Sequence, residues 1–387
     1  MSTTKIEAPI AAIFAAKTVR TFCYGFLGIL LPVYLSQLGV GAAGVGVAVT
    51  LTLAGSAALT WAVRRPAERF GGRAALLALA ALSALAAGIL LVGDRPWLVV
   101  LAAMLGNVAV GAGETGPFLT IEQVMIARAV RPTRRTAMLG VYNLLGYGAA
   151  ALGAAVVAAG PRLLFLVFLA GALLQLAAYA RLPDTRPARP PAVAVLPSAA
   201  VIRRLAALFA LDSFAGGFVL QSLIAYFLHT RWNLGLDELG QVFFVAQTLT
   251  AASLLLAARA AARFGLLNTM VVSHLVSNVL LIAVAAAPTA TVAVALLLAR
   301  QLLSQMDVPT RQAYVMGIVE DHERETAAAV TTLWRTVAQA VTPAVTGWVM
   351  QAVALSAPFV LGGGLKIVYD LLLYRTFRDV KPRVEPE

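Results

Sequence analysis

Charged residues, cysteine and histidine are all scarce in this sequence of 387 residues. Asp, Glu, Lys and Arg together make up 12%, about half of the roughly 25% that is usual in globular proteins. A water-soluble enzyme could not cover its surface with so few charges, and a disordered chain would need more of them. Cys23 is the only cysteine, which excludes an internal disulfide and a thiolate metal cluster. The mean hydropathy of +0.85 points instead to a membrane protein.

Long uncharged runs of Leu, Ala, Val and Gly fill the sequence. Several, such as 43–63 and 163–180, have the roughly 20 residues that a helix needs to cross the hydrocarbon core. With the segments that hold a few charges, the sequence predicts twelve transmembrane helices. We place them near 9–37, 43–63, 74–93, 97–126, 136–160, 162–181, 203–230, 239–259, 266–287, 290–318, 326–352 and 354–376.

The loops between these spans differ in charge from one side to the other. Basic residues gather in every second loop and at the C-terminal end, except that the loop before span eleven is acidic, whereas the alternate loops are nearly bare. Cytoplasmic loops collect Lys and Arg, so we expect both termini in the cytoplasm and the chain in the cytoplasmic (inner) membrane. Topology thus accounts for the net charge of +12, and we expect no nucleic-acid partner.

The two halves of the sequence resemble each other. Arg69-Phe70-Gly71 matches Arg263-Phe264-Gly265 at an offset of 194, and Arg20 matches Asp212 at an offset of 192. A stretch rich in Pro, Arg and Ala separates the halves. We therefore predict an all-α membrane protein with twelve transmembrane helices in two pseudo-symmetric six-helix bundles. The expected divisions are an N-terminal bundle (1–181), a cytoplasmic linker (182–202) and a C-terminal bundle (203–387).

This organisation resembles the major facilitator superfamily over essentially the whole chain. The family has a glycine- and charge-containing motif between spans two and three, to which Glu68, Arg69, Gly71 and Arg73 correspond. Arg64 and Gly72 depart from that motif, and span five lacks the proline of the drug-antiporter motif. The resemblance implies that the four matching residues gate the conformational change without touching the substrate.

Charged residues inside the spans follow the helices that the resemblance places around a central cavity, namely spans one, four, seven and ten. An ionised side chain at the bilayer centre costs about 2.5–3.5 kcal/mol on insertion scales, so these residues need a partner, water or a function. The candidates for substrate binding or proton coupling are Arg20, Glu114, Glu122, Asp212, Arg300, Asp307 and Arg311.

Spacing suggests how some of these candidates act. Arg300, Asp307 and Arg311 fall on a single stripe if span ten is one helix. Arg20 and Asp212, as repeat mates of opposite charge, should approach each other in at least one state, either as a coupling element or as a static lock. Asp307 with Arg311 is a second expected coupling element. Glu122 has a second interpretation, in which it faces water at the cytoplasmic end of span four.

Charges on the other spans have a structural interpretation. Lys366 and Asp370 form an i,i+4 pair in span twelve, and Arg335 should lie at a similar depth, which predicts a structural network. His274 is expected to be a packed, hydrogen-bonded residue.

The leading interpretation is a secondary active transporter that works by alternating access. We expect it to move a small organic solute, most simply as proton-coupled efflux. An organic-anion or nutrient symporter or uniporter is the alternative, and a membrane-embedded lipid enzyme is a remote one. The sequence has no P-loop and no Glu-x-x-His motif, so we expect no enzymatic activity, no cofactor and no metal. We expect a monomer whose partners are its substrate and the lipid bilayer.

Overall fold

The computed structural model describes residues 8–111, 113, 116–183, 198–319 and 324–379. These residues form fifteen α-helices and one short 3₁₀ turn, with no strand among them. The helices of the first half are α1 (Ala8–Gln37), α2 (Ala42–Phe70), α3 (Gly72–Val92), α4 (Pro96–Leu105), α5 (Pro117–Ala129), α6 (Pro132–Ala155) and α7 (Pro161–Ala180), with the turn η1 (Val157–Ala159). Those of the second half are α8 (Ala199–Gly217), α9 (Gln221–Trp232), α10 (Leu236–Phe264), α11 (Leu266–Ala285), α12 (Ala290–Ser304), α13 (Asp307–Ile318), α14 (Arg324–Ala352) and α15 (Ala357–Phe377).

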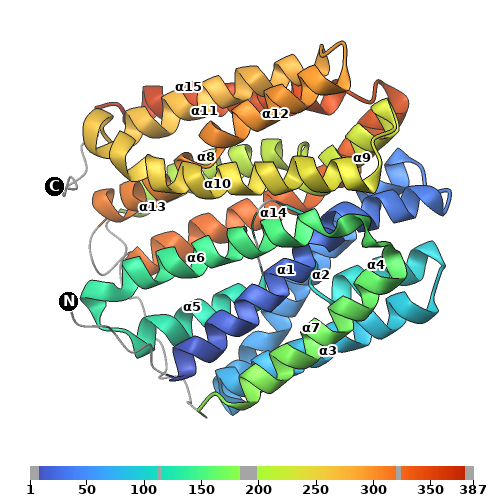
Figure 1. The fold of residues 1–387 in the computed structure, drawn as a ribbon. Coiled ribbons are helices and arrows are strands. Elements are labelled where there is room, and N and C mark those ends of the chain that lie inside the picture. Colours follow the sequence, from blue (N-terminus) through green and yellow to red (C-terminus); the bar gives the residue numbers. More distant parts are fainter. Residues whose placement is uncertain (1–7, 112, 114–115, 184–197, 320–323, 380–387) are drawn as a thin grey trace. The chain divides into compact units, whose positions relative to one another are not determined.

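These helices correspond in order to the twelve predicted spans (Figure 1). In the part of the chain that the structure describes, nine segments are long and apolar enough to cross a membrane. Spans four and ten fall below that length because each is divided into two shorter helices. Span eleven, α14, has 29 residues but carries many Thr residues and Arg335, which make it more polar.

Three spans are broken, namely span four (α4 and α5), span seven (α8 and α9) and span ten (α12 and α13). In span four the break precedes Pro117, which has no backbone N–H and therefore begins a new helix readily. In span ten, Gln305 and Met306 separate the two helices. The stripe predicted from Arg300 to Arg311 crosses this two-residue break and stays a prediction.

The chain divides into two compact units. The first comprises 1–40, 51–190 and 234–244, and the second comprises 41–50, 191–233 and 245–387. Each unit includes a short piece of the other predicted bundle, and most of the predicted linker lies outside the described residues. The division into bundles at 1–181 and 203–387 stays a prediction.

Helices pack in the same way inside the two units. In the first unit α1 packs against α6 and α7, and α3 packs against α7 and α4. In the second unit α8 packs against α14 and α15, and α11 packs against α15 and α12. Because these helices occupy the same places in the two half-sequences, the packing agrees with the repeat seen in the sequence.

The repeated Arg-Phe-Gly sequence has the same local structure in both units. The guanidinium carbon of Arg69 lies 5.1 Å from the ring centre of Phe70, and that of Arg263 lies 5.4 Å from the ring centre of Phe264. Gly71 and Gly265 follow, with φ of 91° and 81° and extended ψ, a region that is essentially restricted to glycine. Both glycines precede the first residue of a helix. The side chain of Glu68 lies outside the described residues, and the gating role of this loop stays a prediction.

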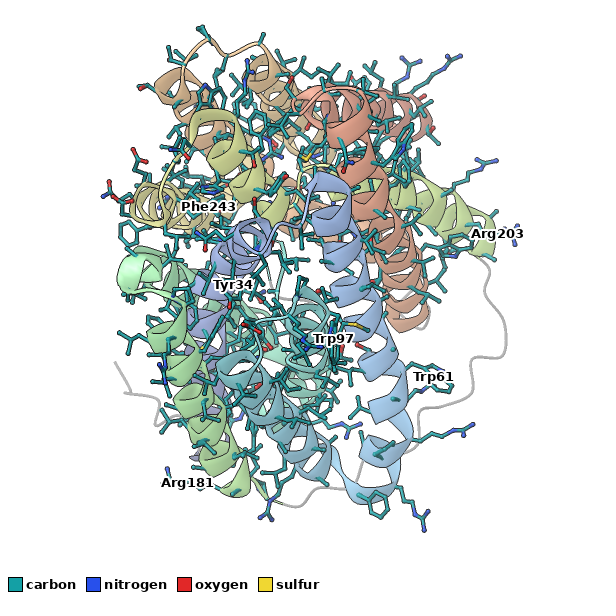
Figure 2. The ribbon with its side chains drawn as sticks, turned by 90° about the vertical axis from the view of Figure 1, so that its right-hand side faces the viewer. Tyr34, Trp61, Trp97, Arg181, Arg203 and Phe243 are labelled. Atoms are coloured by element: carbon teal, nitrogen blue, oxygen red, sulfur yellow. The ribbon has the colours of Figure 1, made fainter. Side chains whose placement is uncertain are left out.

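Large apolar side chains cover the outer surface of the helices. Trp61 and Trp97 are 76% and 60% exposed, and Figure 2 shows Trp61 projecting outward from α2. On α7, Leu163, Leu173 and Leu174 are each more than half exposed. Such a surface suits hydrocarbon rather than water, in agreement with the predicted spans.

Helices α1 and α6 approach closely at two glycines. A Cβ atom on Gly153 of α6 would lie 1.9 Å from the carbonyl oxygen of Phe22, and one on Gly25 would lie 2.1 Å from that of Ala150. Small residues allow helix backbones to come this close in membranes, where dispersion forces hold helices together.

We expect Gly153→Ala to lower the free energy of unfolding by about 1–3 kcal/mol, because the added methyl group must push α1 away from α6. Gly148 of the same helix is the matched control, since a Cβ there meets nothing within 4 Å. Gly148→Ala should be neutral or slightly stabilising. Thermal denaturation of the purified protein in detergent measures both effects, and equal melting temperatures for the two variants would contradict the packing described here.

Candidate functional site: two buried charge networks

The first unit contains a fully buried ion pair between α1 and α5. The two terminal nitrogens of Arg20 donate to the two carboxylate oxygens of Glu122, at 3.1 Å for Nη1 and 2.6 Å for Nη2. Both side chains are completely inaccessible to solvent. This parallel two-bond arrangement is the strongest geometry available to an arginine and a carboxylate.

Two tyrosines complete the hydrogen bonding of Glu122. Tyr142 of α6 donates to Oε2 at 2.5 Å, and Tyr179 of α7 donates to Oε1 at 2.6 Å. Tyr179 also accepts a bond of 2.6 Å from Arg20. The guanidinium carbon of Arg20 lies 4.4 Å from the ring centre of Phe118, which is stacked on Tyr179. Four donors thus hold one carboxylate, and four helices meet at this point.

The second unit contains a larger network that is centred on Asp212 of α8. Lys366 of α15 donates to Oδ1 at 2.6 Å. Arg311 of α13 and Arg335 of α14 lie 3.5 and 3.8 Å from Oδ2. Arg311 also donates to Asp307, one turn away on α13. Asp212 therefore shares its negative charge among three basic side chains on three helices.

His274 of α11 connects this centre to a second carboxylate. Its Nδ1 lies 2.7 Å from Oδ1 of Asp370, and its Nε2 lies 3.4 Å from Nζ of Lys366. Because a lysine ammonium can only donate, a neutral His274 accepts at Nε2 and donates from Nδ1 to Asp370. Asn278 donates to the other oxygen of Asp370 at 3.0 Å.

The charges of this network balance when His274 is neutral. The carboxylates of Asp212, Asp307 and Asp370 are matched by three basic side chains, those of Arg311, Arg335 and Lys366. One further proton on the network would leave a buried net charge of +1, which is costly in a low-dielectric interior. A change in the protonation of the network therefore changes the net charge that the surrounding interior must stabilise.

The structure brings some of the predicted site residues together. Arg20 contacts Glu122. Asp307 contacts Arg311, which in turn lies 3.5 Å from Asp212. Glu122 is buried and ion-paired, so the interpretation that it faces water is wrong. Arg20 and Asp212 belong to different units, and their approach stays a prediction. Glu114 lies outside the described residues.

The predicted structural network in span twelve needs correction. Lys366 and Asp370 do not pair with each other within 4 Å in the part of the chain that the structure describes. Lys366 pairs with Asp212, and Asp370 pairs with His274, so this group and the candidate cavity residues form one network. The i,i+4 spacing misled because both side chains find closer partners on other helices.

Sequence reasoning also missed the two tyrosines of the first unit. Tyr179 has a repeat mate in Tyr369 at an offset of 190, which was an available signal. Arg20 and Asp212 are repeat mates of opposite sign, and Arg311 lies one residue before the position equivalent to Glu122. The two units thus bury an arginine–carboxylate pair on the same two spans with the signs exchanged.

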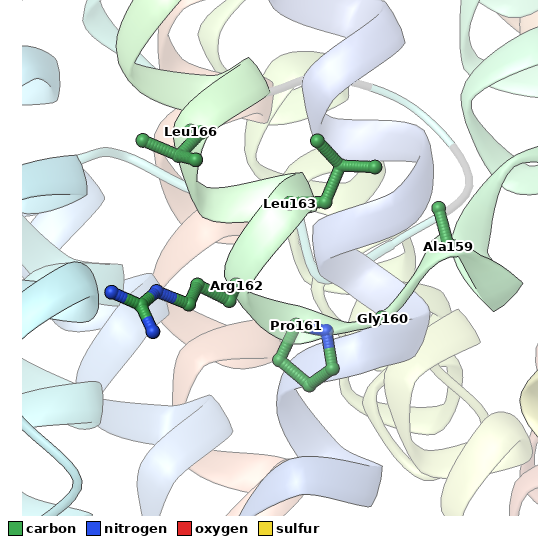
Figure 3. Close-up of a pocket in the computed structure, with 6 residues that line it drawn as sticks. All are labelled: Ala159, Gly160, Pro161, Arg162, Leu163 and Leu166. Carbon is green, nitrogen blue, oxygen red and sulfur yellow. The ribbon is translucent and has the colours of Figure 1, made fainter.

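One further feature of the described residues, a surface hollow, does not form part of this site. A surface hollow at the start of α7 is lined by the residues labelled in Figure 3, and its leucines Leu163 and Leu166 are about half exposed. Such a position suits lipid contact. The described residues contain no group of three or more side chains suited to hold a metal ion.

Comparison with known proteins identifies the class of protein that this fold represents. The family model of the Major Facilitator Superfamily matches residues 13–303. The chain belongs to this superfamily, and it is a multi-pass membrane transporter of small molecules rather than an enzyme.

Individual relatives are distant in sequence. An uncharacterized membrane protein of Saccharomyces cerevisiae is 22% identical over 429 residues, which cover 98% of this chain and 96% of the relative. The xylose transporter XylE from E. coli has a TM-score of 0.76 at 14% identity, with 97% of this chain and 98% of the other covered. The human organic anion transporter MFSD10 has a TM-score of 0.68 at 16% identity, with 95% and 99% covered. These structural likenesses establish the fold.

Proposed function

We propose that this chain is a proton-coupled secondary transporter that exports a small organic solute across the cytoplasmic membrane in exchange for protons. The observation that carries the proposal is the position of His274 between two buried carboxylates, 2.7 Å from Asp370 and 3.8 Å from Asp212. Histidine is a common proton carrier in proteins because its ring can both bind and release a proton. A proton added to this charge-balanced network, or removed from it, changes the net charge of the second unit.

Alternating access turns this proton into a driving force. Asp212, Lys366 and His274 lie on three different helices, α8, α15 and α11, so any relative movement of these helices changes their distances. Protonation weakens the attraction between His274 and Lys366 and strengthens that between His274 and both carboxylates. A conformational equilibrium that depends on these distances therefore depends on the proton.

The first unit supports the proposal by contrast. Its buried carboxylate, Glu122, already accepts four hydrogen bonds, and no histidine contacts it among the described residues. A carboxylate held by four donors has little freedom to change partners, and we assign the Arg20–Glu122 pair to the rigid part of the transport cycle. We further propose that both termini lie on the cytoplasmic side, which matches the basic loops.

Transport by reconstituted liposomes tests the proposal. Wild-type protein with an imposed pH gradient should accumulate at least one compound from a panel of drugs, organic anions, sugars and nucleosides. Asp370→Asn and His274→Asn should each lower this gradient-driven accumulation about tenfold, a typical size for a coupling between two sites. Exchange of labelled for unlabelled solute without a gradient should persist in both variants.

His229→Asn is the matched control, because His229 lies in the last turn of α9, outside the network. It should transport like the wild type. Gradient-driven accumulation that is unchanged in both network variants would remove the network from proton coupling. Wild-type accumulation that ignores the pH gradient would contradict proton coupling itself, and uptake in the direction of the proton movement would contradict export.

A further inference from the structure

Arg300 of α12 differs from the other buried basic residues of the second unit. It is 8% exposed, but within the described residues no carboxylate oxygen lies within 4 Å of it. Arg311 and Lys366, which are equally buried, each contact at least one Asp. Every Asp of the network is already engaged by another residue.

The hydrogen-bonding capacity of Arg300 is almost entirely unused. Within the described part of the chain, its one bond is a weak contact of 3.3 Å from Nη1 to the side-chain oxygen of Gln301, and its buried Nε has no partner. Gln301 also accepts from Ser304 at 3.2 Å. A guanidinium group has five donors in a planar fork, so at least three of them remain to bind something else.

A buried cation without a direct ion pair is costly, even with the charge of Asp307 acting on it from farther away, and membrane proteins keep such residues mainly where they serve a function. The fork geometry of arginine matches the two oxygens of a carboxylate or the oxygens of a phosphate. Arg300 lies one turn before the break between α12 and α13, and broken helices in transporters commonly border the substrate site.

We propose that Arg300 binds the anionic group of the transported solute, so that the solute is a small organic anion with a carboxylate or phosphate group. This inference rests on the proposed transport function. The bound anion would supply the negative charge that the second unit lacks at Arg300. The solute would thus complete the charge balance on α12, while protons act on the separate network around His274.

A structural role for Arg300 is the competing explanation. Arg300 lies near the C-terminal end of α12, where a positive charge interacts favourably with the helix dipole. The two explanations differ in what happens when the charge is removed. If the charge serves the helix, its removal destabilises the unliganded protein. If the charge awaits an anion, its removal leaves that protein equally or more stable.

Ligand-induced thermal stabilisation of the purified protein, in detergent and without a gradient, tests the proposal. The probes are benzoate, benzamide and benzamidine, which have similar shapes and charges of −1, 0 and +1, together with succinate and inorganic phosphate. At least one anion should raise the melting temperature of the wild type, and benzamide and benzamidine should not. Arg300→Gln should need at least about tenfold more of that anion for the same rise in melting temperature, because a charged hydrogen-bond partner is lost.

Arg300→Lys keeps the charge but not the fork, and it should retain part of the anion binding. The unliganded Arg300→Gln protein should melt at or above the temperature of the wild type. The proposal is overturned if none of the anions stabilises the wild type, if Arg300→Gln binds them equally well, or if the unliganded variant melts at a clearly lower temperature. Because this assay uses no gradient, it fails or succeeds independently of proton coupling, which the liposome experiment measures.

Discussion

Replacing Arg20 with Met should lower the free energy of unfolding by about 3–5 kcal/mol, the usual effect of removing one partner of a buried ion pair. The carboxylate of Glu122 would remain in the interior with two tyrosine hydroxyl groups in place of a full positive charge. Four helices, α1, α5, α6 and α7, meet at this group, so the loss would affect the whole first unit. Denaturation of the purified protein by heat or by SDS measures the effect.

The double variant Arg20→Met/Glu122→Met shows whether Arg20 and Glu122 stabilise the protein by pairing with each other or independently. Replacing a buried ion pair by apolar side chains of similar volume is often neutral or stabilising, so the double variant should regain most of the stability that the single variant loses. Lys17→Met is a comparison within the same helix, because Lys17 is also a buried cation of α1, with its Nζ 4.4 Å from the ring centre of Tyr142. A loss below about 1 kcal/mol for Arg20→Met, or a double variant as unstable as the sum of the single ones, would contradict the pairing.

Asp212→Asn should reduce gradient-driven transport about 100-fold, since about 3 kcal/mol separates an intact buried pair from a broken one. Among the described residues, Asp212 is the one that contacts Lys366, Arg311, Arg335 and His274. Its loss would leave the basic side chains in excess and would disconnect α8 from the pair of His274 and Asp370, which we propose to bind the proton. Transport into reconstituted liposomes measures the effect.

The conservative variant Asp212→Glu tests the charge rather than the exact geometry. It should keep a measurable part of the transport, because a carboxylate remains near Lys366. The double variant Asp212→Asn/Lys366→Met should fold more stably than Asp212→Asn alone, since it restores the charge balance. Equal transport by the wild type and Asp212→Asn would remove Asp212 from the mechanism.

Much of the fold could be predicted from the sequence because the bilayer imposes simple requirements. Uncharged runs of about 20 residues and basic loops gave the twelve spans, and the Arg-Phe-Gly repeats at an offset of 194 gave the duplicated packing. The breaks in spans seven and ten were less visible. Gly216 and Gly217 precede Phe218 at the end of α8, but Val219 and Leu220 follow, so hydropathy continues across that break although the helix does not.

The partners of the charged residues could be predicted only in part. Spacing along one helix identified Asp307 and Arg311, which are one turn apart. It gave a wrong answer for Lys366 and Asp370, since the contacts that satisfy them come from α8 and α11, far away in the sequence. Charged side chains such as those of Lys366 and Asp370 reach neighbouring helices, and only the packing of those helices decides which partner lies nearest.

The two units use the same fold for different purposes in this account. The first unit encloses its ion pair with tyrosines and phenylalanine, which suits a rigid body. The second unit connects its ion pair to a histidine and a further carboxylate, which suits proton exchange. Duplication followed by exchange of sign at Arg20 and Asp212 is consistent with this division of labour.

Infrared difference spectroscopy of the purified protein during a pH titration tests the central claim most directly. We expect proton uptake by the network, visible in carboxylic-acid or imidazolium bands, which His274→Asn and Asp370→Asn abolish and His229→Asn preserves. Difference spectra of the two network variants that match those of the wild type throughout the titration would contradict proton binding by the network.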